Sequence, residues 1–475
     1  MFYFSLSLSL SVAVKPHETC GERTFGTIPP GARTSTPPSV AGGRGDDPSR
    51  RAGRLSQQLV HPAPSGATDR GSKGWTTGGR VVVVSVEEGE AKMNRDLKYW
   101  KEAATVILVA GIRRHNLSKS ATNMQTCQQP RGRNLPHKCL ENSGYNYALL
   151  MLQRNTRSSF FPSAYVFPGG RISSVDFSNE WIQLFHPFCQ SPNFKLDTVK
   201  QTARRSPIFA TDKRKLGSQI PAEVAFRICA IRETFEETGV LLVKPNHPDK
   251  ELNNHGVIQL TQCSQNKLEN WRPLVLENAS NFIKLCKELD CLPNIWALKE
   301  WSNWLTPTFQ RRRFDTAFFI CCLEEIPFTA HDGREIISHS WMTPIEAIKH
   351  HQSEQLFIPP PQWYEIGRLC QFNYLQDLQR FSQDRSVEGC ERWLPVRLTA
   401  SDGFATLYPG DELYPENPDF TGETDIKLTS SKSLKEIRLE VTRLHRAECQ
   451  NPYNCTLYVN IEPRYKHVHP FNGHR

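Results

Sequence analysis

The stretch of sequence from residue 232 to residue 240 reads RETFEETGV. It ends a pattern that predicts a helix over 221–238, because Pro221 suits the first turn of a helix and Gly239 suits the position after the last turn. Apolar residues recur along this helix at i, i+4, i+7 and i+11, and they are Val224, Ile228, Ile231 and Phe235. This spacing places them in one stripe that faces the protein core.

Three glutamates lie opposite that stripe, within an arc of roughly 100°, and they are Glu233, Glu236 and Glu237. Carboxylates this close repel one another unless positive charge neutralises them. A hard divalent cation with oxygen ligands, Mg²⁺ or Mn²⁺, removes that repulsion. Arg232, four residues before Glu236, can hold one carboxylate and leave the others for a metal. The alternative is an exposed acidic helix face, which the cluster by itself favours.

Apolar runs on both sides of this helix predict strands at 103–110, 147–152, 165–167, 240–243 and 316–323. The strand at 165–167 stops at the turn Pro168-Gly169-Gly170. Residues 280–304 are predicted to be helical, another helix begins at Pro344, and further strands are predicted at 393–398 and 456–461.

Residues 232–240 match REUxEExGU, with U aliphatic or aromatic, which is the second half of the Nudix box. The chain therefore resembles the Nudix hydrolases, which cleave diphosphates linked to a nucleoside and use Mg²⁺ held on this loop–helix–loop. The first half of the box, Gly-x5-Glu-x7, departs from the pattern, because 61 residues separate Gly170 from Arg232 where the box has 13. This spacing implies an insertion of 48 residues inside the motif. Gly217-x5-Glu223 is a local alternative, but Glu223 is one residue too far from Arg232, so the first box glutamate stays open.

The oversized insertion resembles one subgroup, the animal peroxisomal coenzyme A diphosphatases of the nucleoside diphosphate-linked moiety X motif 19 type. Other similar stretches are AATVILVAG near residue 103, LLMLQR and FFPSAYVFPGG across 149–170, AFRICAIRETFEETGVLL across 225–242, WSNWLTPTFQRRRFDTAFFI across 301–320 and WMTP at 341–344. The resemblance implies an α+β fold, an α/β/α sandwich with a mixed sheet between helices, a long insertion in the box and a C-terminal extension. It also implies metal-dependent hydrolysis of coenzyme A and acyl-coenzyme A to 3′,5′-ADP and (acyl-)4′-phosphopantetheine.

The resemblance assigns roles to the box residues. Glu233 and Glu237 are the leading metal ligands and Glu236 follows, and with Arg232 these three make the expected catalytic set. Glu233 is also a candidate to orient or deprotonate the attacking water. Acids outside the box are further candidates, namely Glu335 and Asp332, although a surface turn around Gly333 explains them slightly better.

Coenzyme A also carries a 3′-phosphate, so a basic lining is expected around the box. Arg154 and Arg157 are the first choice for it, together with Gly169 and Gly170 beside the diphosphate. The run Arg311-Arg312-Arg313 is the second choice. A solvated basic loop is the alternative for each of these clusters.

Composition limits the other possibilities. The chain has 475 residues, of which 38 % are apolar, and a formal charge of +9, which permits an anionic ligand without requiring nucleic acid. We expect 1–92, with 13 of the 28 glycines, to be a disordered extension, with Met93 as an alternative start. We expect the Nudix domain over 93–350, with its insertion at 171–221, and an extension over 351–475.

The fourteen cysteines are too dilute for a disulfide scaffold, and we expect reduced, mostly buried thiols in an intracellular compartment. No membrane span is expected, a monomer is favoured, and the family resemblance places the protein in the peroxisome, with the mitochondrion second. The terminal Gly473-His474-Arg475 is not a recognisable peroxisomal tripeptide. Two alternative functions remain: hydrolysis of capped RNA or of NADH- and ADP-ribose-type dinucleotides, and a non-catalytic Nudix-fold binding module.

Overall fold

The computed structural model describes residues 82–84, 100–112, 144–188, 196–199, 204–210, 217–246, 262–423 and 427–471. The chain divides into two units, Met1–Thr76 and Thr77–Arg475, and the described residues all belong to the second. Of the segment 1–92 only the strand β1 (Val82–Val84) is described, and it pairs antiparallel with β14 (Lys427–Thr429). The other predictions for that segment, including a start at Met93, lie outside the described residues. Within the described ranges no helix is long and apolar enough to span a membrane.

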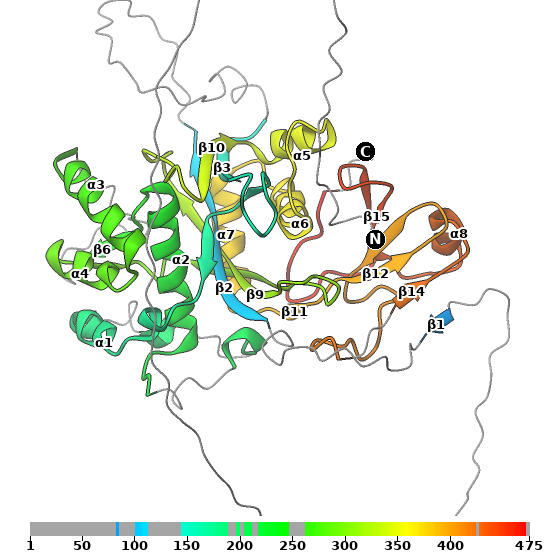
Figure 1. Ribbon diagram of the computed structural model, residues 1–475, viewed down its shortest axis with the longest axis horizontal. Helices are drawn as coiled ribbons and strands as arrows, with labels where there is room; N and C mark the ends of the chain where they lie inside the picture. Colours follow the sequence, from blue (N-terminus) through cyan, green and yellow to red (C-terminus); the bar gives the residue numbers. More distant parts are fainter. Residues whose placement is uncertain are drawn as a thin grey trace, which may run out of the picture. The chain divides into compact units, whose positions relative to one another are not determined.

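The main sheet is mixed and has the strand order β10-β3-β2-β9-β8-β11, with β4 added to β3 and β5 added to β2 (Figure 1). Its strands are β2 (Lys101–Gly111), β3 (Tyr147–Arg154), β4 (Tyr165–Val166), β5 (Gly169–Arg171), β8 (Lys299–Leu305), β9 (Phe314–Leu323), β10 (Ile336–Met342) and β11 (Arg392–Trp393). The pairs β2–β9 and β8–β11 are parallel, and the other neighbours are antiparallel.

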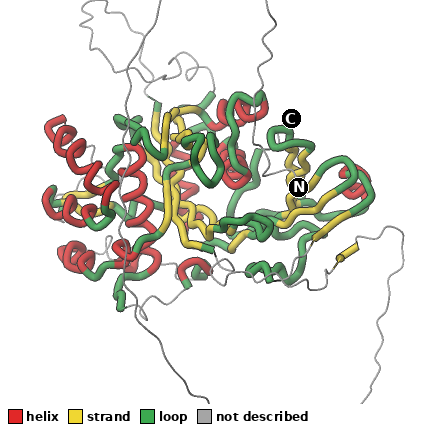
Figure 2. Tube along the Cα trace, in the orientation of Figure 1, coloured by secondary structure: helices red, strands yellow, loops and turns green. Residues whose placement is uncertain are grey.

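Helices cover both faces of this sheet (Figure 2). Alternate residues of β2 point to opposite faces, so Val106 and Leu108 pack in the core that contains α2 (Ala222–Thr238), while Ile107 and Val109 pack in the opposite core. That opposite core is covered by α5 (Pro344–Gln352), α6 (Pro360–Leu369) and α7 (Leu375–Ser386). The predicted α+β sandwich is confirmed.

Smaller elements surround this sandwich. The short strands β6 (Val243–Pro245) and β7 (Cys291–Pro293) pair with each other, and the helices of that region are α1 (Glu180–Phe185), α3 (Gln262–Glu277) and α4 (Asn281–Glu288). Single 3₁₀ turns lie at Ser174–Phe177, His186–Phe188, Leu196–Val199 and Pro207–Phe209. A second sheet has the order β1-β14-β12-β13-β15-β16 and packs against α8 (Leu434–Leu439); its remaining strands are β12 (Val396–Thr399), β13 (Phe404–Leu407), β15 (His445–Cys449) and β16 (Cys455–Val459).

Three expectations need correction. The predicted helix over 280–304 is wrong beyond α4, because the chain then forms β7 and β8, where Trp301 and Trp304 donate indole hydrogen bonds of 2.7 Å to Glu365. The strand expected at 240–243 is displaced, since β6 begins only at Val243. The expectation of reduced thiols fails at one pair, because Cys449 and Cys455 face each other across β15 and β16 and form a disulfide. The other cysteines described are free, and nearly all of them are buried.

Candidate active site

The three box glutamates lie on the last two turns of α2. The helix begins after Pro221 and ends at Gly239, which has φ of +73°, a left-handed conformation that favours glycine. Both predicted ends are therefore confirmed. Nearly every residue of α2 is buried, however, so the glutamates do not form the exposed acidic face that was the alternative.

The turn Gly169-Gly170 lies directly against these glutamates. The backbone N–H of Gly169 donates a 2.9 Å hydrogen bond to Oε2 of Glu237. A Cβ on Gly170 would lie 2.3 Å from Oε2 of Glu233, closer than van der Waals contact allows. Glycine at 170 therefore leaves the space that the Glu233 carboxylate occupies, and 61 intervening residues do not prevent the turn and the helix from meeting.

Arg232 holds the carboxylates from the other side. Its Nη1 donates 2.8 Å hydrogen bonds to Oε1 of Glu233 and to Oε1 of Glu236. Its Nε and Nη2 donate to the two oxygens of Asp176 at 2.9 and 3.0 Å. Asp176 is fully buried and Arg232 is nearly so, and this pair fixes the guanidinium in one orientation.

Asp176 is a site residue that the sequence reasoning missed. It follows Gly170 with five residues between them, which is the Gly-x5 spacing of the box with aspartate in place of glutamate. The insertion therefore follows Asp176, and 55 residues separate it from Arg232 where the box has seven. The local alternative Glu223 lies in the first turn of α2, where it pairs with Arg205 at 2.6 Å.

Burial and mutual repulsion make the glutamates reluctant to ionise. Burial is the main reason that the pKa of Glu233 is raised to about 7. The charge of Arg232 opposes this rise, and the charge of Glu236 adds to it. Burial also raises the pKa of Glu236, against the opposing effect of Arg232. The pKa of Glu237 lies well above its ordinary value, because burial and the charge of Glu233 outweigh the hydrogen bond from Gly169.

Within the described ranges, no three His, Cys, Asp or Glu side chains are gathered closely enough to hold a metal ion. Glu233 and Glu236 are turned to Arg232, and Glu237 is turned to Gly169. The donor set nevertheless fits a hard divalent cation, which prefers carboxylate oxygens as ligands. The carboxylates are crowded, and the positive charge beside them is too small to neutralise them. Gly170 also leaves room for the Glu233 carboxylate next to the backbone.

The predicted phosphate-binding arginines have different surroundings. Arg154 donates to Ser158 and to Oε1 of Glu335, the latter at 2.7 Å, and its charge reaches Glu237. Arg157 is exposed. In the run 311–313, Arg312 donates to Ser159, whereas Arg313 donates to backbone carbonyls at 306, 420 and 421 and therefore holds loops together.

The two acids outside the box also differ from each other. Asp332 accepts backbone N–H groups from residues 334, 335 and 336, so it serves the turn around Gly333. Glu335 is half-exposed and paired with Arg154, and its negative charge raises the pKa of Glu236 and of Glu237. Glu335 therefore lies beside the box, while Asp332 has the structural role that was its alternative.

The sequence matches two family descriptions, the NUDT19 Nudix domain over residues 100–369 and the NUDT19 C-terminal domain over 397–460. The chain belongs to the NUDT19 family of Nudix hydrolases. Three relatives carry the name "Acyl-coenzyme A diphosphatase NUDT19". The protein of Xenopus laevis is 47 % identical to this chain, and the match covers 80 % of this chain and 97 % of the relative. The protein of Gallus gallus is 44 % identical, with 80 % of this chain and 96 % of the relative covered. The protein of Homo sapiens is 39 % identical, with 79 % of this chain and 95 % of the relative covered.

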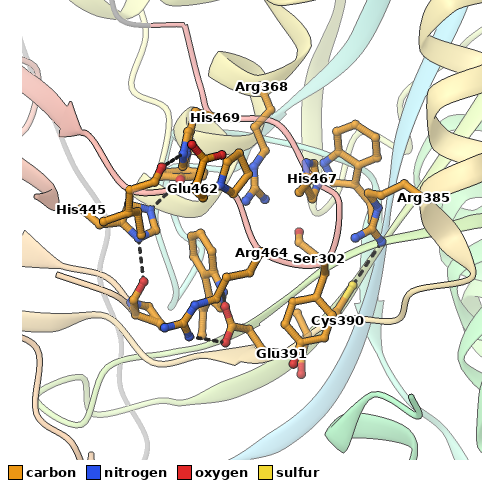
Figure 3. Close-up of a pocket in the computed structure, with 18 residues that line it drawn as sticks. Ser302, Arg368, Arg385, Cys390, Glu391, His445, Glu462, Arg464, His467 and His469 are labelled. Atoms are coloured by element: carbon orange, nitrogen blue, oxygen red, sulfur yellow. Dashed lines mark hydrogen bonds and ion pairs between the residues drawn. The ribbon is translucent and has the colours of Figure 1, made fainter. Parts of the chain in front are cut away.

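This NUDT19-family chain also has a pocket on the other face of the main sheet, between β8, α6, α7 and the tail at 461–469 (Figure 3). Four buried polar atoms without a hydrogen-bond partner line it: Ser302 Oγ, Asn303 Oδ1, Arg385 Nε and His467 Nε2. Its free volume of about 30 Å³ has room for about two water molecules. The pocket is therefore too small for a nucleotide.

Proposed function

We propose that this chain hydrolyses the diphosphate bond of coenzyme A and of acyl-coenzyme A, giving 3′,5′-ADP and (acyl-)4′-phosphopantetheine. Water adds to one phosphorus, and the bond from that phosphorus to the bridging oxygen breaks. The observation that carries the proposal is the contact between the turn Gly169-Gly170 and the box glutamates on α2. The names of the three relatives, which match this chain along nearly their whole length, supply the substrate class.

The proposed metal ligands are Glu233 and Glu237, with Glu236 next and the carbonyl oxygen of Gly170 as a further candidate. The family uses a divalent metal ion, and we propose Mg²⁺ or Mn²⁺, which when bound neutralises charge on the diphosphate and acidifies water. Arg232 orients Glu233 and Glu236, and the Gly169 N–H orients Glu237. As an alternative to metal ligation, we propose Glu233 as the group that orients or deprotonates water.

We propose Arg154, Arg157, Gly169 and Gly170 as coenzyme-binding residues, as the sequence suggested. The position of Arg154 beside Glu335, within reach of the charge of Glu237, supports it as the stronger of the two arginines. The exposure of Arg157 leaves it free to meet a phosphate from solvent.

A substrate panel on the full chain tests the function. Coenzyme A, acyl-coenzyme A, capped RNA, ADP-ribose and NADH are compared by kcat/KM with Mg²⁺ and with Mn²⁺. We expect the coenzyme A substrates to be cleaved fastest. A higher kcat/KM for capped RNA or ADP-ribose would replace the substrate class, and no turnover of any substrate would favour the binding module.

The variant Glu237→Gln tests the metal-ligand assignment. It keeps the shape of the side chain and its hydrogen bond from Gly169, but it removes the negative charge, so we expect the loss of most activity in a chain that remains folded. Circular dichroism checks the fold. Undiminished turnover would remove Glu237 from the ligand set.

The compartment and the oligomeric state are also proposals. The family resemblance favours the peroxisome, with the mitochondrion second, and a monomer. Imaging of the full chain with a free C-terminus distinguishes the compartments, and light scattering measures the mass in solution.

A further inference from the structure

Arg272, on α3, lies at the end of the box helix although it comes from a separate part of the chain. Its Nε donates a 2.9 Å hydrogen bond to the backbone carbonyl of Glu236. A Cβ on Gly239 would lie 3.5 Å from its Nη1, so the guanidinium covers the end of α2. Burial lowers the pKa of Arg272, and the negative charges of Asp332 first and of Glu237 second oppose that change, so a box carboxylate lies within electrostatic reach of the guanidinium.

Two buried nitrogens in this region have no hydrogen-bond partner. One is Nη2 of Arg272, and the other is Nδ1 of His339 on β10. The two side chains are neighbours, since the charge of Arg272 contributes to the lowered pKa of His339 after burial and His331. Nη2 of Arg272 is a donor, while Nδ1 of His339 donates or accepts according to its tautomer. Unsatisfied buried donors are uncommon in folded proteins, so the free Nη2 indicates that an acceptor belongs there.

The segment that carries His331 is joined to the box helix. The N–H of Ala330 donates a 2.9 Å hydrogen bond to the carbonyl of Thr238, and the rings of His331 and His339 are 6.0 Å apart. His331 is exposed and Arg272 is half-buried, so solvent reaches the edge of this region, while Nη2 of Arg272 and Nδ1 of His339 lie beneath its surface. Arg272, His331 and His339 therefore lie together at the C-terminal end of the box helix, where Asp332 and Glu237 supply negative charge.

The other arginines near the box have fewer nitrogen atoms free to donate to a ligand. Both Nη atoms of Arg232 are hydrogen-bonded to protein, and so is its Nε. Arg154 is paired with Glu335. The one hydrogen bond described for Arg272 uses Nε, and among the ion pairs described none involves this residue.

We propose that Arg272 binds the substrate by donating to a non-bridging oxygen of the diphosphate that is cleaved, with His339 beside it. This inference rests on the proposed function, and it adds a binding residue outside the box, on α3. Contact with the backbone of Glu236 and the charge of Glu237 favour the diphosphate over a more distant phosphate. A guanidinium suits the task because its fork matches phosphate oxygens.

The test compares wild type, Arg272→Gln and Arg272→Lys with coenzyme A and with 3′-dephospho-coenzyme A. Loss of a charge-assisted hydrogen bond predicts that Arg272→Gln raises KM about 10- to 100-fold for both substrates, while kcat and Mn²⁺ affinity change little. Arg272→Lys should fall between the other two, because lysine keeps the charge without the fork. The matched control is Arg380→Gln on α7, which removes one exposed arginine across the sheet.

Three results would overturn the assignment. The first is an unchanged KM, and the second is an increase with coenzyme A only, which would assign Arg272 to the 3′-phosphate. The third is a lower kcat with weaker Mn²⁺ binding and no change in KM, because that result shows that Arg272 only holds the carbonyl of Glu236.

A binding experiment separates this inference from the proposed function. Calorimetry measures the binding of inorganic pyrophosphate with Mg²⁺ to wild type and to Arg272→Gln. If wild type cleaves no coenzyme A substrate, the proposed function fails, yet binding about 10- to 100-fold weaker in the variant still supports Arg272. Equal binding by both proteins, or none by wild type, overturns the inference.

Discussion

The pair Asp176–Arg232 is the contact that joins the two halves of the interrupted box, and Asp176→Asn tests it. Asparagine keeps the shape of the side chain and one oxygen acceptor, but it removes the charge that faces Nε and Nη2 of Arg232. Asp176 is fully buried and Arg232 is 3 % exposed, so solvent does not replace the lost charge. Breaking a buried pair costs about 3–5 kcal/mol when one partner is removed, and because the amide keeps a hydrogen bond we expect about 3 kcal/mol.

Activity should fall with stability, because Arg232 also orients Glu233 and Glu236. Misplaced carboxylates at the proposed site cost catalysis steeply, and we expect kcat to fall about 100-fold while the chain remains folded at 25 °C. Urea unfolding followed by tryptophan fluorescence gives the free energy of unfolding, and coenzyme A hydrolysis gives kcat. Asp176→Glu, which restores the residue type of the box, should retain more activity than Asp176→Asn.

Glu223→Gln is the matched control. Glu223 is equally buried, but its partner Arg205 is 47 % exposed, so we expect a loss of about 1 kcal/mol. Glu223 precedes Glu237 by 14 residues on α2, about 20 Å along the helix, and its replacement should leave kcat unchanged. If Glu223→Gln lowers kcat more than Asp176→Asn does, Asp176 does not hold the place of the first box acid and the reasoning fails.

Three further predictions follow from individual contacts. Gly170→Ala places a Cβ 2.3 Å from Oε2 of Glu233, so the flexible carboxylate must turn away. We expect kcat to fall about 10- to 100-fold, with a loss of stability below about 1 kcal/mol. Full turnover by this variant would contradict the prediction. Burial lowers the pKa of His445 to about 3. As the pH falls below about 6.5, this histidine therefore binds a proton in the unfolded chain but stays neutral in the folded chain. This group should therefore lower the free energy of unfolding by about 1.4 kcal/mol for each pH unit between about pH 6 and 4. In His445→Gln the free energy of unfolding should depend correspondingly less on pH over the same range. Cys449→Ser opens the disulfide across β15 and β16, and we expect a loss of about 2 kcal/mol in urea unfolding without reductant, a difference that should vanish with reductant present.

Local signals predicted the box helix because its ends depend on neighbours in sequence. Pro221 and Gly239 bound α2, and a stripe at helical spacing identified the buried side. The long apolar runs that became β2 and β9 were equally clear, since strands buried on both faces read as continuous apolar sequence.

Other parts depend on partners that are distant in sequence. β8 was predicted as part of a helix, whereas in the fold Trp301 and Trp304 donate their indole N–H groups to Glu365, which lies 61 to 64 residues later. Arg272 carries no sequence signal, because only the folded chain places α3 against the end of α2. Asp176 had a signal, the Gly-x5 spacing, but aspartate in place of glutamate concealed it.

The buried Asp176–Arg232 pair connects the two ends of the insertion that interrupts the box. Lengthening the connection from seven to 55 residues is three doublings, which adds about 2 kcal/mol of closure entropy if the insertion is a free loop. The insertion is not free, because it packs Trp181, Phe185 and Phe209 into the core that contains α2, and each packed side chain shortens the segment left to close. The expected loss of about 3 kcal/mol on removing the Asp176 charge arises because the Arg232 guanidinium would stay buried without its partner. Stability and catalysis at this site therefore depend on the same guanidinium, since Arg232 both closes the insertion and orients Glu233 and Glu236.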